Sequence, residues 1–538
     1  MRLCELPSDI LSLILKWVVE SVCFGNSLKA NISVAAINQR LRQAALPLVY
    51  KRVSVDFPAT GSGGSNGATT NAVYTTNLDL VVSAGCMDLV RCVRVGVARP
   101  SYGIDELALA ATVLREAKAE WPAVKSLEVA GNWITPSVFV RDNVPDAESI
   151  QRVLDALVAV VPNVCTLLTG GRSHIAPVRC LFQALAERYQ RQLQSVHFTF
   201  PMDPQEDVQF TRLQRLFINR LSFSDWAIPR IDPAALVKLK ITDLDPMHSW
   251  TSFGADDNSP SIEFPVLRHL QLVYNNFASD PQPAASGEAS TPKLHFPQLQ
   301  TIRLWCSKSR CAFLESAALP PHLEKCTLSL PVAECPDIAD TAMPAARDWE
   351  VCIDGGRDEE YVIPRQIRRL LLRARQCEAA HLNLRNSSRS VNTSGILGSG
   401  LTDLTIATHI SVDDMLALVG NLPQLVYISV RCHSFRSPQA DLSLPKPGEH
   451  GHPVAPLSTT IKRLGIAVHH DEPWDIKRAA LVKYLLLGIP SLLALSMGDA
   501  NKIKLKLFTK KYGPRYPHIE TVAFSANPIS RLPSMLFG

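Results

Sequence analysis

One short phrase returns many times along this chain, and it constrains the fold more than any other feature. "VKSLEVAGNWI" begins at Val124, "LRHLQLVYNNF" at Leu267 and "IETVAFSANPI" at Ile519. All three read apolar-x-x-apolar-x-apolar-x-x-Asn-x-apolar, and shorter copies begin at Leu193, Leu213, Leu236, Leu299, Leu323, Leu401, Leu425, Ile461 and Leu492. Most neighbouring copies lie about 20 to 36 residues apart. Such a period indicates a repeat architecture, in which each unit buries its apolar face only against its neighbours.

The centre of the phrase predicts a short strand, because alternate side chains are apolar and would point to one face. Segments with helical periodicity precede several of these strands, at 104–121, 147–161, 176–190, 411–422 and 474–489. Units of strand, loop and helix at this spacing predict an α/β solenoid with parallel inner strands and outer helices. Polar stretches rich in Pro, Ser or Gly at 278–293, 387–399 and 433–457 are interpreted as excursions from the solenoid.

This pattern resembles the leucine-rich repeat. In that family the Asn of the phrase turns inward after the strand and bonds backbone groups of neighbouring turns. The resemblance gives this role to Asn132, Asn275 and Asn527, whereas other copies carry Ser307 and His409 there. Copies cannot be counted between Leu330 and Leu382, although "WEVCI" at Trp349 fits a degenerate one.

The N-terminal segment has an unusually wide apolar surface. "LPSDILSLILKWVVES" starts at Leu6, and Ser8 and Asp9 are typical of a helix start. Its polar residues fall three or four apart and form one narrow stripe, which leaves most of the circumference apolar. A second segment, "AALPLVYKRV", starts at Ala44.

These two segments, in this order, resemble an F-box over about the first 55 residues. The resemblance implies a helical unit that packs on its own helices and docks into a Skp-type adaptor, which links it to a cullin. A wide apolar circumference is what burial on two sides requires. The adaptor contacts that the motif match implies are Leu6, Pro7, Ile10, Ile14, Pro47 and Leu48. The expected domains are an F-box-like helical domain at 1–57, a flexible Gly/Ser-rich linker at 58–72 and a leucine-rich-repeat-like solenoid at 73–538.

A second interpretation stays open for the N-terminal helices. They would then cap the first repeat and shield its open edge, in a scaffold that binds a protein partner and has no link to ubiquitin. A third class, an enzyme whose site lies in the excursions, would need a pocket of converging polar groups.

Composition and motifs give little sign of chemistry. The sequence holds no Gly-x-Ser-x-Gly, Walker loop or His-Glu-x-x-His, so no catalytic, cofactor-binding or metal site is expected, and "HHDEPWD" at His469 is interpreted as a solvated loop. A net charge of +5, from 55 basic and 50 acidic residues, does not indicate nucleic acid as a partner. No stretch of 18 uncharged apolar residues occurs, so no membrane partner is expected. Thirteen scattered cysteines, without a Cys-x-x-Cys pair or a secretion signal, favour the cytoplasm or the nucleus.

The sequence therefore predicts a substrate receptor of a Skp–cullin–F-box ubiquitin ligase that catalyses nothing itself. Its unknown target protein is expected to contact exposed positions beside the strand cores. The examples chosen are Glu128, Gln271, Arg303 and Ser429.

Overall fold

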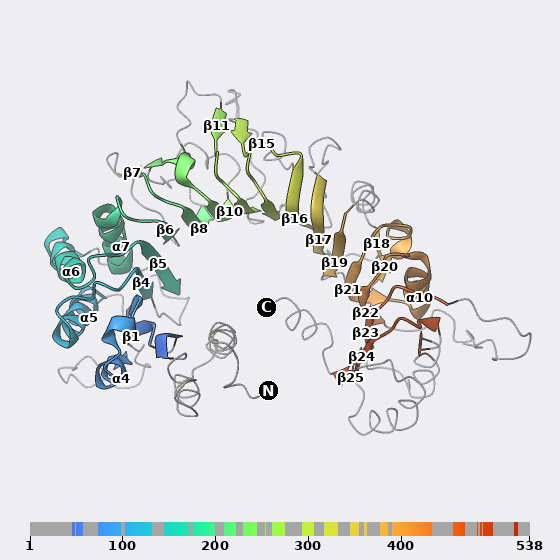
Figure 1. Ribbon diagram of the computed structural model, residues 1–538, viewed down its shortest axis with the longest axis horizontal. Helices are drawn as coiled ribbons and strands as arrows, with labels where there is room; N and C mark the ends of the chain where they lie inside the picture. The colour runs from blue at the N-terminus through green and yellow to red at the C-terminus, as the bar shows by residue number, and fades with distance from the viewer. Residues whose placement is uncertain are drawn as a thin grey trace, which may run out of the picture. The chain divides into compact units, whose positions relative to one another are not determined.

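The protein forms two compact units, Met1–Leu267 and Arg268–Gly538 (Figure 1). The computed structural model describes residues 46–48, 50–57, 74–97, 103–131, 145–171, 176–198, 209–221, 230–244, 253, 261–274, 293–305, 317–331, 345–354, 360–362, 377–385, 390–432, 456–468, 481, 485–486, 488–498 and 521–525. Each unit is built around a parallel sheet, and the two are described in turn.

The sheet of unit 1 adds its parallel strands in chain order. Each strand pairs with the next in the series β1 (Arg52–Asp56), β3 (Cys92–Val97), β4 (Ser126–Gly131), β5 (Thr166–Gly171), β6 (Ser195–Phe198), β8 (Arg215–Leu221) and β10 (Lys238–Leu244). One row of register partners is buried throughout and consists of Val53, Val93, Leu127, Leu167, Val196, Leu216 and Leu239. Each such side chain contributes about 1.5–3 kcal/mol on burial, so this row holds the strands in register.

Three helices cover one side of the first strands in unit 1, namely α5 (Gly103–Ala117), α6 (Ala147–Val160) and α7 (Ala176–Tyr189) (Figure 1). On α5 the buried side chains include Leu107, Ala110 and Leu114, spaced three or four apart as an amphipathic helix requires. Asp146 caps α6 by accepting a hydrogen bond from the Ser149 N–H at 2.8 Å. The shorter α4 (Leu78–Ser83) and η2 (Met87–Leu89) directly precede β3 in the chain.

A short local segment closes the outer edge of β1. Strand β2 (Thr75–Thr76) pairs with it antiparallel, and the hydroxyls of both threonines donate to carbonyls of β1. Next to them, the Asn77 side chain accepts from the Ser54 N–H at 2.9 Å and donates to the Arg52 carbonyl at 2.8 Å. The edge that a parallel sheet would leave open is therefore satisfied from within the unit.

We expect Asn77→Leu to lower the free energy of unfolding of unit 1 by about 1–3 kcal/mol, because two backbone groups of β1 lose their partner. Urea denaturation followed by circular dichroism measures the change. Asn421→Leu is the control, since Asn421 donates to a single carbonyl, that of Ala417, at an exposed helix end. An equal effect of the two substitutions would contradict the role given to Asn77.

The sheet of unit 2 also follows chain order. Parallel partners run through β12 (His269–Tyr274), β14 (Thr301–Trp305), β16 (His322–Pro331), β17 (Ala345–Asp354), β19 (Ala379–Arg385), β21 (Asp403–Ile410), β22 (Tyr427–Cys432), β23 (Arg463–Val468), β24 (Ala494–Gly498) and β25 (Thr521–Ser525). A buried row again crosses the strands and consists of Leu272, Leu304, Leu328, Val351, Leu382, Leu404, Ile428, Leu464 and Leu495. Strand β21 carries a register shift between Ile406 and His409.

Short strands form part of the described residues in several of the connections. The described pairs are β7 (Gln209–Phe210) with β9 (Arg230–Ile231), β13 (Lys293–His295) with β15 (Ala317–Ala318), and β18 (Glu360–Val362) with β20 (Ser390–Asn392). Strand β11 (Ser261–Glu263) lies between β10 and β12 in the chain, whereas the short helices η3 (Pro233–Ala235) and η6 (Thr393–Gly395) directly follow β9 and β20. In unit 2, α10 (Val412–Asn421) follows β21 and is capped by the Ser411 hydroxyl, which accepts from the Asp414 N–H at 3.0 Å.

The architecture is α/β, with long and mostly parallel sheets and few helices, which is compatible with a solenoid. Four predicted helices are confirmed as α5, α6, α7 and α10, although α5 ends at Ala117 and not at Trp121. Of the predicted helix 474–489, the described residues 481, 485, 486 and 488 are helical. In the connections that hold β7, β9, β13 and β15, where the sequence predicted no helix, the described residues include these short strands.

The strand phrases are confirmed as strands, and "WEVCI" is part of β17. Strand β1 lies within the range 1–57 that was expected to be helical, and it pairs with β3. Part of the predicted excursion 387–399 forms β20 and η6. Asn132, Asn275 and Asn527 lie outside the described residues, as do the expected linker 58–72 and the part 433–455 of the excursion 433–457.

Candidate interaction surface

A continuous polar row crosses the strands of unit 2 next to the buried one. It consists of the register partners Gln271, Arg303, Thr327, Glu350, His381, Asp403, Tyr427 and Arg463. Each lies one residue before a buried position of its strand and so points to the opposite face of the sheet. Strands of parallel sheets lie about 4.8 Å apart, so these polar groups form a closely spaced band.

Charges of opposite sign meet along this band. Lys325 Nζ lies 3.2 Å from Glu350 Oε2, the Thr327 hydroxyl donates to the same oxygen at 3.2 Å, and His381 Nδ1 lies 3.3 Å from Asp403 Oδ2. Burial raises the pKa of Glu350, but the favourable interactions with Lys325, Thr327 and Arg303 outweigh it and leave the pKa below its ordinary value. Glu350 is therefore ionised at neutral pH, and its charge is held in place.

The corresponding row of unit 1 divides into two parts of different character. It runs through Ser54, Arg94, Glu128, Leu168, His197, Phe217 and Lys240. At its first end Glu128 bonds Arg52 at 2.6 Å and Arg94 at 3.3 Å, and Arg94 also bonds Asp56 at 3.0 Å. The charges at this end thus neutralise one another.

Gly170 makes room for the Glu128 carboxylate on the neighbouring strand. A Cβ atom at Gly170 would clash with Glu128 Oε1 and would lie 3.0 Å from Ala130 Cβ. The Glu128 side chain is only 13% exposed although it lies on the polar face. Its carboxylate is consequently engaged within the sheet.

The predicted target contacts differ in their surroundings. Arg303 is exposed and Gln271 is half-buried, whereas Glu128 is ion-paired. Ser429 is fully buried, so the expectation that it is exposed is wrong. The reason is local, because Gly465, its partner on β23, lets the Ser429 hydroxyl pack against the next strand.

Among the predicted adaptor contacts, Pro47 is exposed and Leu48 is half-buried. Leu6, Pro7, Ile10 and Ile14 lie outside the described residues.

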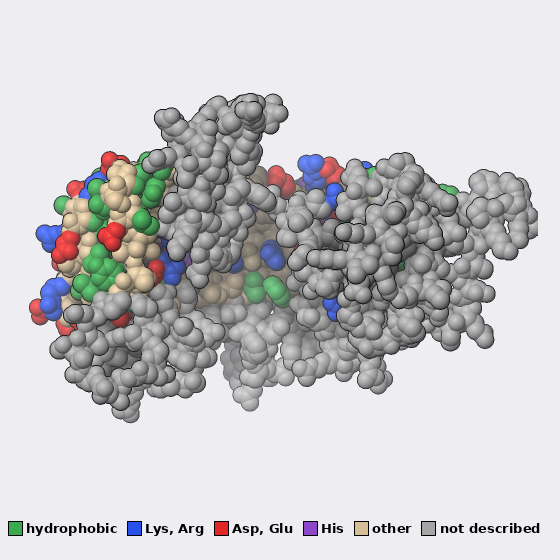
Figure 2. All heavy atoms as spheres, turned by 90° about the horizontal axis from the view of Figure 1, so that it is seen from below, with side chains coloured by type: hydrophobic (Ala, Val, Ile, Leu, Met, Phe, Trp, Pro, Cys, Tyr) green, Lys and Arg blue, Asp and Glu red, His purple; other side chains and the backbone are tan. Residues whose placement is uncertain are grey.

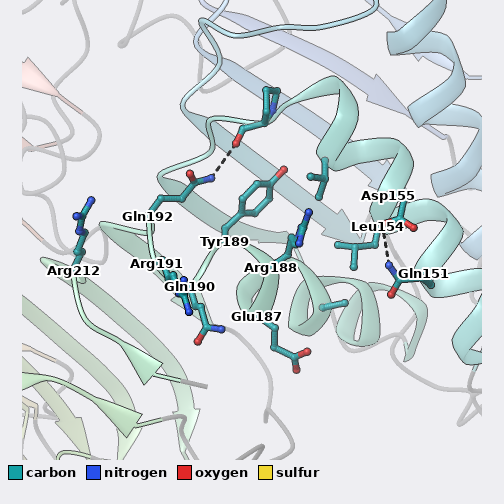
Figure 3. Close-up of a pocket in the computed structure, with 13 residues that line it drawn as sticks. Gln151, Leu154, Asp155, Glu187, Arg188, Tyr189, Gln190, Arg191, Gln192 and Arg212 are labelled. Carbon is teal, nitrogen blue, oxygen red and sulfur yellow. Dashed lines mark hydrogen bonds between the residues drawn. The ribbon is translucent and has the colours of Figure 1, made fainter. Parts of the chain in front are cut away.

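A surface cavity of about 1020 Å³ lies between α6 and the C-terminal part of α7 in unit 1 (Figure 3). The Tyr189 hydroxyl donates to the Val161 carbonyl, and the Gln192 amide donates to the Pro162 carbonyl. Arg188, Arg191 and Arg212 line the cavity but do not converge on one point in Figure 3.

Over the helices of unit 1, acidic, basic and hydrophobic side chains are mixed in Figure 2. This side of the unit has the character of an ordinary solvated surface.

The described residues contain no group of three His, Cys, Asp or Glu side chains that could bind a metal ion. No helix formed by those residues is long and apolar enough to cross a membrane. The polar rows were missed in the sequence because β1, β3, β5 and β19 were not identified as copies of the phrase. Alternation within each strand could have identified them once the strands were aligned.

Comparison with known proteins finds no matching family model and no significant match to a curated protein.

Proposed function

We propose that this chain is the substrate-recognition subunit of a Skp–cullin–F-box ubiquitin ligase, and that both units are parts of one leucine-rich-repeat-like solenoid. The observation that carries the proposal is the polar row of register partners that crosses successive strands beside a buried apolar row. Such a band offers many side chains at fixed spacing on a rigid support, which suits the recognition of an extended protein surface.

The N-terminal helices would bind the Skp-type adaptor under this proposal. Strand β2 and Asn77 already satisfy the outer edge of β1, so the sheet has no need of a helical cap at that edge. This supports the proposal over the alternative, in which the helices only shield the sheet. The exposed Pro47, five residues before β1, is in keeping with an adaptor contact.

The chain would contribute no catalytic group of its own. By holding the target near the charged transfer enzyme, it would raise the effective concentration of a target lysine. Action in the cytoplasm or the nucleus is part of the same proposal.

The test is a pull-down of purified Skp-type adaptor with the full chain and with the double variant Leu6→Asp, Ile10→Asp. We expect adaptor binding by the wild type and at least a tenfold loss in the variant, because two charges would have to enter an apolar interface. The control is Ser12→Lys, Lys16→Glu, which changes the polar stripe and is expected to keep adaptor binding.

Thermal unfolding of the same proteins separates the two interpretations of the N-terminal helices. A receptor keeps the melting temperature of its sheets in the Leu6→Asp, Ile10→Asp variant, whereas a cap loses several degrees. Absence of adaptor binding by the folded wild type would favour a scaffold unrelated to ubiquitin.

A further inference from the structure

We propose that the strands β6, β8 and β10 of unit 1 form a binding site for an acidic segment of the target protein. The site consists of three cations, Arg215, Lys238 and Lys240, around the rings of Phe217 and His197, and is called the basic cluster below. It rests on the proposed function in one respect, since it identifies the chemistry of the target that the solenoid would hold.

Register places like charges against one another in this cluster. Arg215 and Lys238 are direct partners across β8 and β10, and Lys240 is the partner of Phe217. Directly opposed like charges destabilise a sheet. Lys238 and Lys240 are two residues apart on one strand, so they emerge on the same face roughly 7 Å apart.

No carboxylate among the described side chains forms an ion pair with these three cations. The opposite end of the same sheet is different, because there Arg52 and Arg94 are neutralised by Glu128 and Asp56. Among the described side chains, the cations at one end of this polar face are paired and those at the other end oppose one another, and this arrangement favours an acidic partner at the second end.

The rings give the cluster an apolar centre. Lys238 Nζ lies 5.5 Å from the centroid of Phe217, and the His197 ring meets Phe217 edge-to-face at 5.9 Å. Burial and the nearby Lys240 lower the pKa of His197, so its ring is neutral at pH 7. Arg215 is exposed while Phe217, Lys238 and Lys240 are half-buried, so a partner can reach all of them.

The dimensions favour an acidic peptide over a nucleic acid. Binding of single strands relies on a groove that follows several phosphates and on several aromatic side chains for stacking. Here three cations occupy two adjacent strands around one Phe ring, and the whole chain carries a net charge of only +5. Clusters of this size are typical of the recognition of acidic motifs in peptides.

The experiment measures binding of a fluorescent peptide, Glu-Asp-Phe-Glu-Asp-Phe-Glu-Asp, to the full chain by anisotropy at low salt. The same peptide with Gln and Asn in place of the acids is the comparison. We expect the wild type to bind the acidic peptide at least tenfold more tightly than the neutral one, with affinity falling as salt rises. The double variant Lys238→Glu, Lys240→Glu should lose at least tenfold in affinity for the acidic peptide.

The matched control is Arg188→Glu, Arg191→Glu, which changes the net charge equally on the helical side of the same unit and should bind as the wild type does. Phe217→Leu, which keeps an apolar side chain, should weaken binding severalfold. Circular dichroism confirms that each variant is folded.

Two results would overturn the proposal, namely unchanged affinity in the Lys238→Glu, Lys240→Glu variant, or equal binding of the acidic and neutral peptides. Tighter binding of a mixed single-stranded oligonucleotide than of the acidic peptide would overturn it in favour of nucleic acid.

Adaptor binding is measured in parallel. Loss of the adaptor interaction with retained peptide binding contradicts the proposed ligase function alone, whereas the reverse contradicts only the basic cluster.

Discussion

Leu304→Asp is expected to abolish the cooperative unfolding transition of unit 2 and to lower its free energy of unfolding by more than about 4 kcal/mol. Leu304 is fully buried in the centre of β14 and lies directly between Leu272 and Leu328 on the two neighbouring strands. A carboxylate at this position has no described cation as a register partner, so it would be buried without compensation. Urea denaturation monitored by circular dichroism measures the effect.

The adjacent residue supplies a matched control. Arg303 precedes Leu304 on the same strand but points to the polar face and is exposed. Arg303→Asp introduces the same side chain and should change the free energy of unfolding by no more than about 1 kcal/mol. Equal destabilisation by the two substitutions would contradict the assignment of Leu304 to a buried face of β14 and of Arg303 to an exposed one.

Trp121→Ala is expected to lower the free energy of unfolding of unit 1 by about 3–5 kcal/mol, because it opens a large cavity. Trp121 is 1% exposed, and its indole N–H donates to the Leu114 carbonyl at the end of α5 at 3.2 Å. Its backbone N–H donates to the Val160 carbonyl at 2.7 Å, so the residue also joins α5 to α6.

Trp121→Phe separates packing from hydrogen bonding at this position. It keeps most of the ring volume and removes the indole donor, but the Leu114 carbonyl still accepts from the Lys118 N–H at 3.1 Å, so a loss of about 0.5–1.5 kcal/mol is expected. Chemical denaturation of both variants against the wild type gives the comparison. A loss below 1 kcal/mol in Trp121→Ala would contradict the central position assigned to Trp121.

The repeated phrase was sufficient to predict most of the strands, because the alternation around Leu127, Leu270 or Leu404 is strong. It failed for β3 and β19, where Val90 and Ala379 stand at the first apolar position, three residues before the register partners of Leu127 and Leu404. In both strands the alternation persists with smaller side chains, which a neighbouring strand can accommodate as long as the row stays apolar.

The candidate surface was harder to predict for a different reason. Which polar side chains become neighbours depends on the register of strands that are far apart in the sequence, as with Arg52 and Glu128, which are separated by 76 residues. Alternation also fails to predict exposure, since Ser429 lies on the polar side of β22 and is nevertheless buried. The opposed cations of β8 and β10 follow from register alone and are not evident in either strand by itself.

The agreement between strand order and chain order also bears on how the protein folds. In unit 1, β3 pairs with β1 and β4 pairs with β3, so every parallel strand finds its partner one step earlier in synthesis. The loops to be closed are of moderate length, and the entropic cost of closing them grows only slowly with that length. Assembly of each unit is therefore expected to proceed strand by strand from an early nucleus, as in one-dimensional repeat arrays, while the chain is still leaving the ribosome.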